Sequence, residues 1–390
     1  MMSNKDVYGE VFTPIELVEE LLEQLPKHVW TNDSLRWLDP CAGTGIFFTA
    51  VFDKLMDGLE YKFPDPRKRK QHILKNMLFM YEINPKSVKL LQKVFGKKAN
   101  IDHNYLTDTS QETYDIILGN PPYQTPKVES YRGSVGNKTL WDKFLVQSMN
   151  KLSNGGYLGF ITPANWRRPE HPLYKLLVKE NRLEYLHVYS KNDGMKHFHV
   201  QTRFDLYLIK RTKNHVSNYN TTVIDEQGIV YDNFRPSLWP FIPNYAFPII
   251  YKHLCKKEQE VIFSSTMYDA RTLNTKKNNI YRYPIIHTIT NDHIGILYAK
   301  ERLGQIGIPK VILSFNEKQY PINDYSGKYG MSQICFALPI IKTNGDKRSY
   351  QEIGNDIIQK VSSKEFEMIL KATKWGAFQT DYRMFKYIVL

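Results

Sequence analysis

The sequence predicts a two-domain α/β protein whose first domain is a doubly wound, mostly parallel sheet. Strand-like and helix-like stretches alternate through the first half of the chain, as they do in parallel sheets. A glycine-containing turn at residues 39–45 joins an early strand to a helix. After Lys210 the pattern changes to a polar stretch and then to irregular sequence. A chain of 390 residues also exceeds one typical core, so two domains are expected.

The elements of the first domain can be predicted in order along the chain. Thr13 can cap a helix and Glu16 can close a capping box, so a helix is expected to begin at Pro14. Residues 192–194 have the chemistry of a turn between two strands. Strands are expected at 35–38, 77–81, 114–118, 157–162, 183–189 and 203–209, and further helices at 46–56, 84–95 and 140–152.

The domain boundary is expected near residue 215, where the chain becomes polar. We therefore predict a first domain at 1–212, a linker at 213–221 and a second domain at 222–390. The second domain is expected to be α+β, and it is rich in Tyr, Lys, Asn and Pro.

Charge and composition restrict the class of protein. A formal net charge of +13 favours a polyanionic partner, for which nucleic acid is the first candidate. The three cysteines are widely spaced, which argues against a disulfide framework or a zinc finger and for a reducing compartment. No apolar run reaches about 18 residues, and the N-terminal stretch is polar. We expect a cytoplasmic protein without a membrane partner.

The motif with the most specific chemistry is Asn120, Pro121, Pro122 and Tyr123, which directly follows an apolar strand. Open α/β sheets bind ligands at this end of their strands. The exocyclic nitrogen of adenine is a poor nucleophile because its lone pair is delocalised. The Asn120 side-chain oxygen and the Pro121 carbonyl can accept its two hydrogens and stabilise the developing positive charge. Tyr123 can stack on the base; the alternative is a proline-rich turn with a surface aromatic.

A second motif, residues 39–47, lies between a strand and a helix. Gly43 and Gly45 permit close backbone approach to a ligand at the helix start, although such a turn often needs glycine for its shape alone. Glu82 ends the next strand, where an acidic residue commonly accepts hydrogen bonds from a ribose diol.

Together these motifs resemble those of the adenine-specific amino-methyltransferases of type II restriction–modification systems, in the gamma order. The resemblance rests on residues 9–14, 38–47, 81–84 and 120–123, with further likeness at 156–166, 309–312 and 330–333. It covers residues 5–210 well. It implies the seven-stranded, Rossmann-like fold of adenosylmethionine-dependent methyltransferases, followed by a domain that recognises the DNA target.

The resemblance also implies roles for single residues. Phe12, Thr13 and Pro14 would line the methionine end of S-adenosyl-L-methionine; Asp39, Gly43 and Gly45 would cradle it; and Glu82 would hold its ribose. Asn104 stands where relatives carry the acidic residue that binds the cofactor's adenine, with Asp102 as the alternative. An amide oxygen can still accept that hydrogen bond. Phe198 would grip the flipped base, or it is a hydrophobic plug between strands.

Contacts to DNA are expected from two places. Trp166, Arg167 and Arg168 follow a strand on the expected active-site side, where they are candidates for phosphate contact or a surface basic pair. In the second domain, residues 271–277 and 281–283 mix basic and aromatic side chains, which suits DNA binding. His197 and His199 lack an evident third ligand, so no metal site is expected.

The sequence as a whole predicts a site-specific DNA adenine-N6 methyltransferase that acts on a flipped-out base in duplex DNA. We expect a monomer, with a cognate restriction endonuclease as a candidate partner and no nuclease activity of its own. Two alternatives stay open: a methyltransferase for protein glutamine or RNA that shares the Asn120–Tyr123 motif, and a non-catalytic DNA-binding module.

Overall fold

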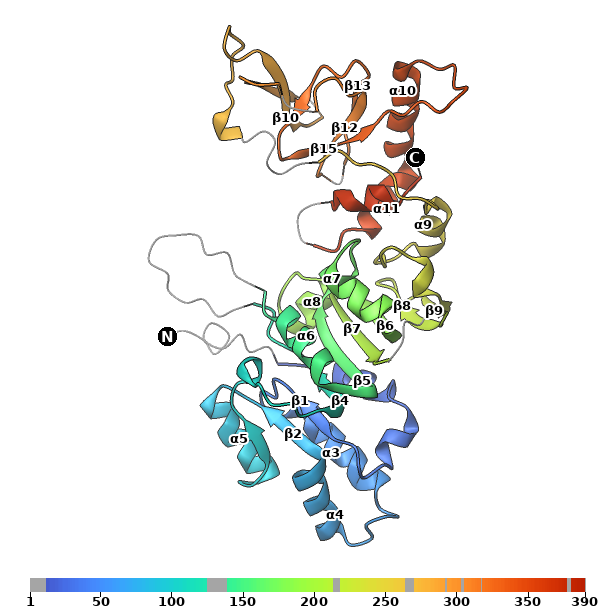
Figure 1. Cartoon of the computed structure of the whole chain (residues 1–390). Coiled ribbons are helices and arrows are strands. Elements are labelled where there is room, and N and C mark those ends of the chain that lie inside the picture. Colours follow the sequence, from blue (N-terminus) through green and yellow to red (C-terminus); the bar gives the residue numbers. More distant parts are fainter. Residues whose placement is uncertain are drawn as a thin grey trace. The chain divides into compact units, whose positions relative to one another are not determined.

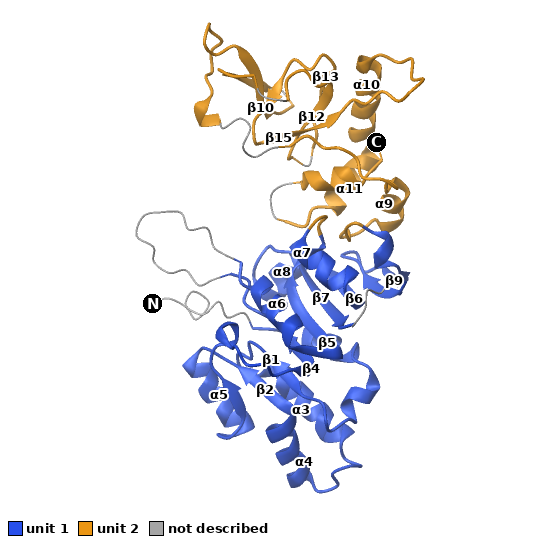
Figure 2. Cartoon of the chain, in the orientation of Figure 1, with its two compact units in different colours: residues 1–167, 171–239 blue, residues 168–170, 240–390 orange. Residues whose placement is uncertain are grey.

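The computed structural model describes residues 12–124, 139–212, 218–263, 270–291, 293–302, 305–316, 318–376 and 380–389. The chain forms two compact units (Figure 2). Unit 1 comprises residues 1–167 and 171–239, and unit 2 comprises residues 168–170 and 240–390. The expected loop at 124–138 and the N-terminal part of the motif at 9–14 lie largely outside the described residues.

Unit 1 is built on a nine-stranded, mostly parallel sheet in the order β3-β2-β1-β4-β5-β7-β6-β8-β9 (Figure 1). Its strands are β1 (Trp37–Asp39), β2 (Leu78–Tyr81), β3 (Asn100–Asp102), β4 (Tyr114–Gly119), β5 (Leu152–Pro163), β6 (Arg182–Tyr189), β7 (Phe204–Lys210), β8 (Thr221–Ile224) and β9 (Val230–Phe234). The first seven form the expected doubly wound α/β sheet, with β7 antiparallel to β5 and β6.

Helices cover both faces of this sheet (Figure 1). They are α2 (Ile15–Glu23), α3 (Ile46–Gly58), α4 (Pro66–His72), α5 (Pro85–Phe95), α6 (Trp141–Lys151), α7 (Pro172–Tyr174) and α8 (Lys191–Phe198). Successive strand residues point to opposite faces. Trp37 and Leu38 are nevertheless both buried, as are Ile116 and Ile117, so the strands are covered on both sides.

Strands β8 and β9 extend the sheet beyond the seven expected strands. Strand β8 pairs in parallel with β6, and β9 pairs antiparallel with β8. The compact first unit therefore continues to Trp239, whereas the sequence placed the boundary at 213–221. The polar stretch at 213–221 leads into β8, which pairs with β6 in the same sheet. A fragment ending at Thr212 would expose the edge of β6.

Two local expectations were wrong. Residues 192–194 do not form a hairpin turn but lie in helix α8, whose first turn is capped by Ser190 and Asp193. The predicted capping box at Thr13 also does not form: helix α2 begins after Pro14, with no side-chain hydrogen bond at that cap. Thr13 is therefore available for another contact.

In its described residues, unit 2 is an α+β arrangement of two small sheets and three α-helices, in agreement with the expected second domain. One sheet contains β11 (Ile294–Ala299), β10 (Tyr283–Ile289) and β14 (Gly330–Met331). The other contains β13 (Ile322–Asp324), β12 (Lys310–Ser314) and β15 (Cys335–Pro339). The helices are α9 (Phe247–His253), α10 (Tyr350–Val361) and α11 (Lys364–Ala372). None of the described helices of either unit is both long and apolar enough to cross a membrane.

Candidate active site

The candidate site lies where the order of the sheet reverses. Strand β1 pairs in parallel with both β2 and β4, so the connections that leave β1 and β4 diverge at this point. Ligands of open α/β sheets bind beyond the strand ends at such a switch point. A Cβ on Gly119, at the end of β4, would lie 3.3 Å from both Asp39 Oδ1 and Cys41 Sγ. The absence of a side chain at Gly119 lets the loop after β4 approach the loop after β1 closely.

The two predicted cradle glycines have different surroundings. Both have left-handed backbone, with φ of +54° at Gly43 and +88° at Gly45. A Cβ on Gly45 would lie 2.7 Å from Leu91 Cδ2 and 2.9 Å from Phe95 Cε2, on helix α5. A Cβ on Gly43 would meet no described atom within 4 Å. Gly45 therefore allows helix α5 to pack, whereas the space beside Gly43 is open.

Two carboxylates hold the turn. Glu82 Oε2 accepts a hydrogen bond from the Gly43 amide and Oε1 accepts one from the Asn84 amide, both at 2.7 Å. Asp39 is almost fully buried, and its Oδ1 accepts from the Cys41 amide at 3.0 Å. Asp39 Oδ2 is buried without a hydrogen-bond partner among the described residues. Burial, and secondarily the charge of Glu82, raises the pKa of Asp39 to about 7.

Asn120 lies opposite this turn. Its Nδ2 donates to Thr13 Oγ1 at 3.1 Å. Its Oδ1 is buried and has no hydrogen-bond partner in the part of the chain that the structure describes. One small pocket is lined by Phe12, Thr13, Asn120 and six residues between Cys41 and Phe47. The structure thus joins residues from three predicted motifs, and an amide oxygen with an unmet hydrogen-bonding capacity is among them.

The interior behind Tyr123 contains an ion pair that the sequence analysis missed. Tyr123 Oη is buried without a hydrogen-bond partner among the described residues. Burial, with a contribution from the Asp205 carboxylate, raises the pKa of Tyr123 well above its usual range. Asp205 pairs with Arg167 at 2.7 Å between Oδ2 and Nε, and both side chains are 0% exposed. Asp205 is the single acidic residue in the apolar strand 204–209, and this pattern in the sequence could have indicated it.

Arg167 was predicted to contact phosphate. In this structure its side chain is fully buried and forms an ion pair with Asp205 inside unit 1, so it does not reach the surface. Trp166 is equally buried and packs at 5.2 Å, centroid to centroid, against Tyr207. Both belong to the interior rather than to the surface. Arg168 differs, since it is only half-buried and falls in unit 2. Its contact to phosphate stays a prediction.

Three further predicted residues lie in unremarkable surroundings. Phe198 is the last residue of α8, is 4% exposed and packs edge-on against Phe204 with ring centroids 4.8 Å apart. Asn104 is exposed, and its Oδ1 accepts from the Leu106 amide at 3.2 Å. Phe12 is 70% exposed at the pocket. Their roles toward base and cofactor stay predictions.

A second pocket on unit 1 is wider but lacks any of these motifs. It lies between residues 108–113 and helix α6. Its buried cation, Lys151, is paired with Asp108 Oδ2 at 2.6 Å and donates to the Ser110 carbonyl at 2.9 Å. The buried cation of that pocket is therefore paired with a carboxylate, and Asn120 remains the better candidate for chemistry. No group of three potential metal-ligating side chains occurs among the described residues.

Comparisons with known proteins agree with the motifs. Residues 55–194 match the model of the Eco57I restriction-modification methylase family. An uncharacterized adenine-specific methylase of Mycoplasma pneumoniae is 24% identical, over 40% of this chain and 55% of its own length. The type II methyltransferase M.HincII of Haemophilus influenzae is 23% identical, over 63% of this chain and 45% of its own. The chain thus spans about half the length of these curated relatives.

A solved structure of a DrdV–DNA complex resembles the fold with a TM-score of 0.51 and 10% identity, covering 91% of this chain and 52% of that chain. At that identity the likeness concerns the fold alone. The sequence matches carry the relationship, and they bear out the resemblance that the motifs indicated. This chain is similar in sequence to the Eco57I restriction-modification methylase family and to adenine-specific and type II methyltransferases.

Proposed function

We propose that this chain is a site-specific DNA methyltransferase that transfers a methyl group from S-adenosyl-L-methionine to N6 of an adenine flipped out of duplex DNA. The observation that carries the proposal is Asn120 Oδ1, a buried acceptor without a partner among the described residues, next to the glycine-rich turn. Buried polar atoms are nearly always hydrogen-bonded in folded proteins. An acceptor kept without a partner beside a ligand pocket is suited to a donor on a substrate.

An aromatic amine supplies such a donor. The two hydrogens of adenine N6 would be accepted by Asn120 Oδ1 and by the Pro121 carbonyl. This pulls the nitrogen toward tetrahedral geometry and frees its lone pair for attack on the methyl group. Pro121 and Pro122 restrict the backbone torsions that aim this carbonyl. The same oxygens stabilise the positive charge that develops on nitrogen, and they do so without reorganising in a buried site. The product proton then leaves to water.

The residues of the turn fit the cofactor. A side chain on Gly43 would project into open space, and glycine leaves that space free. Asp39 Oδ2 has no hydrogen-bond partner among the described residues. Glu82, whose oxygens accept from the Gly43 and Asn84 amides, ends strand β2 beside the turn and is the residue assigned to the ribose diol. S-adenosyl-L-methionine supplies the methyl group when bound. Asn104 would bind its adenine amino group through Oδ1, which accepts from the Leu106 amide and has a second lone pair.

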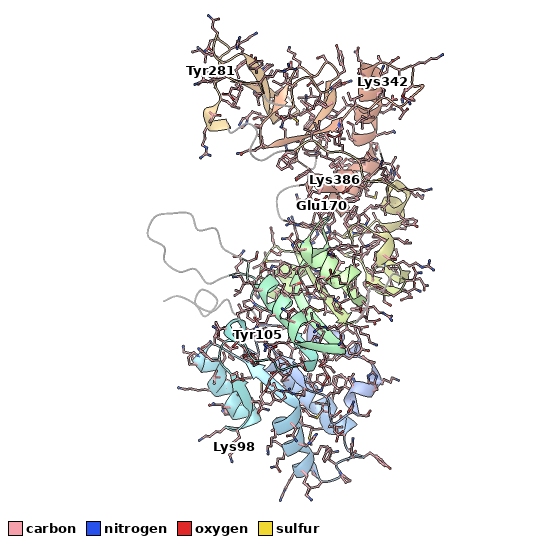
Figure 3. The ribbon with its side chains drawn as sticks, in the orientation of Figure 1. Lys98, Tyr105, Glu170, Tyr281, Lys342 and Lys386 are labelled. Carbon is pink, nitrogen blue, oxygen red and sulfur yellow. The ribbon has the colours of Figure 1, made fainter. Side chains whose placement is uncertain are left out.

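Duplex DNA is the proposed substrate, and unit 2 is the proposed source of sequence recognition. The net charge of +13 favours phosphate binding. In unit 2, Lys300 lies 5.2 Å from the Tyr281 ring and Arg282 lies 5.6 Å from the Tyr283 ring. Tyr281 lies at one end of this unit (Figure 3). Such basic and aromatic pairs suit contact with phosphates and bases.

The test is long-read sequencing of unmethylated DNA after treatment with the purified chain and S-adenosyl-L-methionine. N6-methyladenine in one sequence context is expected. Asn120→Ala should abolish it, and Asn76→Ala, an exposed amide on unit 1, should not. Methylation of another base, or of protein or RNA in place of DNA, would overturn the proposal. Equal methylation by the Asn120→Ala chain would overturn the assigned acceptor.

A further inference from the structure

The hydroxyl of Thr13 is bonded to the side chain that is proposed to bind the target amine. By sequence, Thr13 is a helix cap; in the structure it caps nothing, because α2 begins after Pro14 without a side-chain bond. Thr13 Oγ1 instead accepts from Asn120 Nδ2 at 3.1 Å, and Thr13 is 8% exposed. The two residues are more than a hundred positions apart in sequence, so this hydrogen bond is made by the fold and not by local geometry.

A carboxamide has a donor end and an acceptor end, and only the acceptor end can bind a hydrogen of the substrate amine. Rotation by half a turn would present Nδ2, a donor, to the target nitrogen. In this structure Nδ2 is engaged by Thr13, and Oδ1 is the end without a hydrogen-bond partner among the described residues. We propose that Thr13 is a positioning residue that holds the Asn120 carboxamide with Oδ1 available to the target amine. This inference rests on the proposed function and deepens it.

Both partners of this hydrogen bond are on fixed elements. Helix α2, which follows Thr13 directly, buries Leu17, Val18, Leu21 and Leu22. The Glu20 carboxylate on the same helix accepts from Tyr185 Oη at 3.0 Å and from Tyr189 Oη, and it lies 2.7 Å from His187 Nδ1, all on strand β6.

On the other side of the bond, Asn120 follows Gly119, the glycine in close contact with Asp39 and Cys41. The Asn120 side chain therefore meets a hydroxyl that cannot shift far without moving a helix. Such support from rigid elements is what holds a reacting group within a fraction of an ångström of its productive place.

Thr13 also lines the pocket, so the alternative is that this residue contributes to cofactor affinity. The two roles predict different kinetics. A residue that only binds the cofactor affects its affinity and leaves the rate at saturation unchanged. A residue that positions Asn120 affects the rate of the methyl-transfer step at saturating cofactor and DNA, because the lost orientation matters in the transition state.

The experiment compares Thr13→Val, which removes the hydroxyl at nearly constant volume, with Thr13→Ser, which keeps it. Thr31→Val, on a turn of unit 1 outside the pocket, is the matched control. Single-turnover methyl transfer is measured at saturating cofactor and DNA, and S-adenosyl-L-methionine binding is measured by calorimetry. Circular dichroism checks folding, and Thr13→Ala replaces Thr13→Val if the latter is unfolded.

We expect Thr13→Val to slow transfer about tenfold, the effect of losing one hydrogen bond of ordinary strength. Cofactor affinity should stay near that of wild type, and Thr13→Ser should restore most of the rate. An unchanged rate in Thr13→Val, a loss confined to cofactor affinity, or a Thr13→Ser chain as slow as Thr13→Val would overturn the positioning role. A wild-type chain that methylates no DNA would overturn the proposed function itself. This result comes from the wild-type chain alone, so it is distinct from any effect of the Thr13 variants.

Discussion

Replacing each glycine of the turn by alanine should separate packing from ligand binding. Alanine in left-handed backbone costs about 1–2 kcal/mol, and this cost applies to both Gly43 and Gly45. At Gly45 the new methyl would lie 2.7 Å from Leu91 and 2.9 Å from Phe95, on a packed helix. Overpacking of that kind adds about 1–3 kcal/mol. Gly45→Ala should therefore lower the free energy of unfolding by about 2–5 kcal/mol, and Gly43→Ala by about 1–2 kcal/mol.

Cofactor binding should show the opposite order. A methyl on Gly43 enters the space that the proposed ligand needs, whereas a methyl on Gly45 faces helix α5. Urea unfolding of both variants gives the stability difference, and calorimetry with S-adenosyl-L-methionine, at temperatures where both are folded, gives the affinities. Equal destabilisation of the two variants would refute the packing argument. A folded Gly45→Ala chain that has lost affinity, beside a Gly43→Ala chain that has kept it, would show that Gly45 is the ligand-facing glycine.

Three other outcomes are expected. Tyr123→Phe should keep most of the activity, because its hydroxyl has no hydrogen-bond partner among the described residues; Tyr123→Ala should weaken base gripping by roughly 1–3 kcal/mol, read as 2-aminopurine fluorescence in the target position. The pKa of Asp39 is about 7 in the folded chain against an ordinary value of 3.8, so folding takes up a proton between these pH values. The free energy of unfolding should fall as pH rises through that window, and urea titrations should show a smaller fall in Asp39→Asn. Arg167→Ala leaves the Asp205 charge buried and should cost about 3–5 kcal/mol in thermal or urea unfolding; a change below 1 kcal/mol would contradict a closed ion pair.

The sequence predicts well what depends on local chemistry. Strands such as β4 and helix α5, with Asn84 at its cap and Pro85 in its first turn, follow from hydrophobic pattern and capping residues. The order of the motifs is enough to place Asn120, Glu82 and Gly43 at one end of the sheet. These positions are set by strand ends, which the pattern of the chain reveals.

The same reasoning fails where a residue's partner is distant. Thr13 has the chemistry of a cap, and its bond to Asn120 depends on how the finished sheet brings them together. Arg167 has the chemistry of a surface cation, and its burial depends on Asp205 in another strand. The compact first unit extends past the predicted boundary for a similar reason, since the short strand β8 is recognisable only by its pairing with β6.

Helix α2 has a consequence for the order in which the protein forms. Its Glu20 is bound by three side chains of β6, so the helix cannot reach its final place until the ribosome has made the chain as far as Tyr189. Thr13 precedes this helix directly. The proposed site is therefore completed only when the far side of the sheet exists, although two of its motifs are synthesised much earlier. A nascent or truncated chain that lacks β6 would keep its glycine-rich turn and still lack the contacts of Glu20 that fix helix α2 behind Thr13.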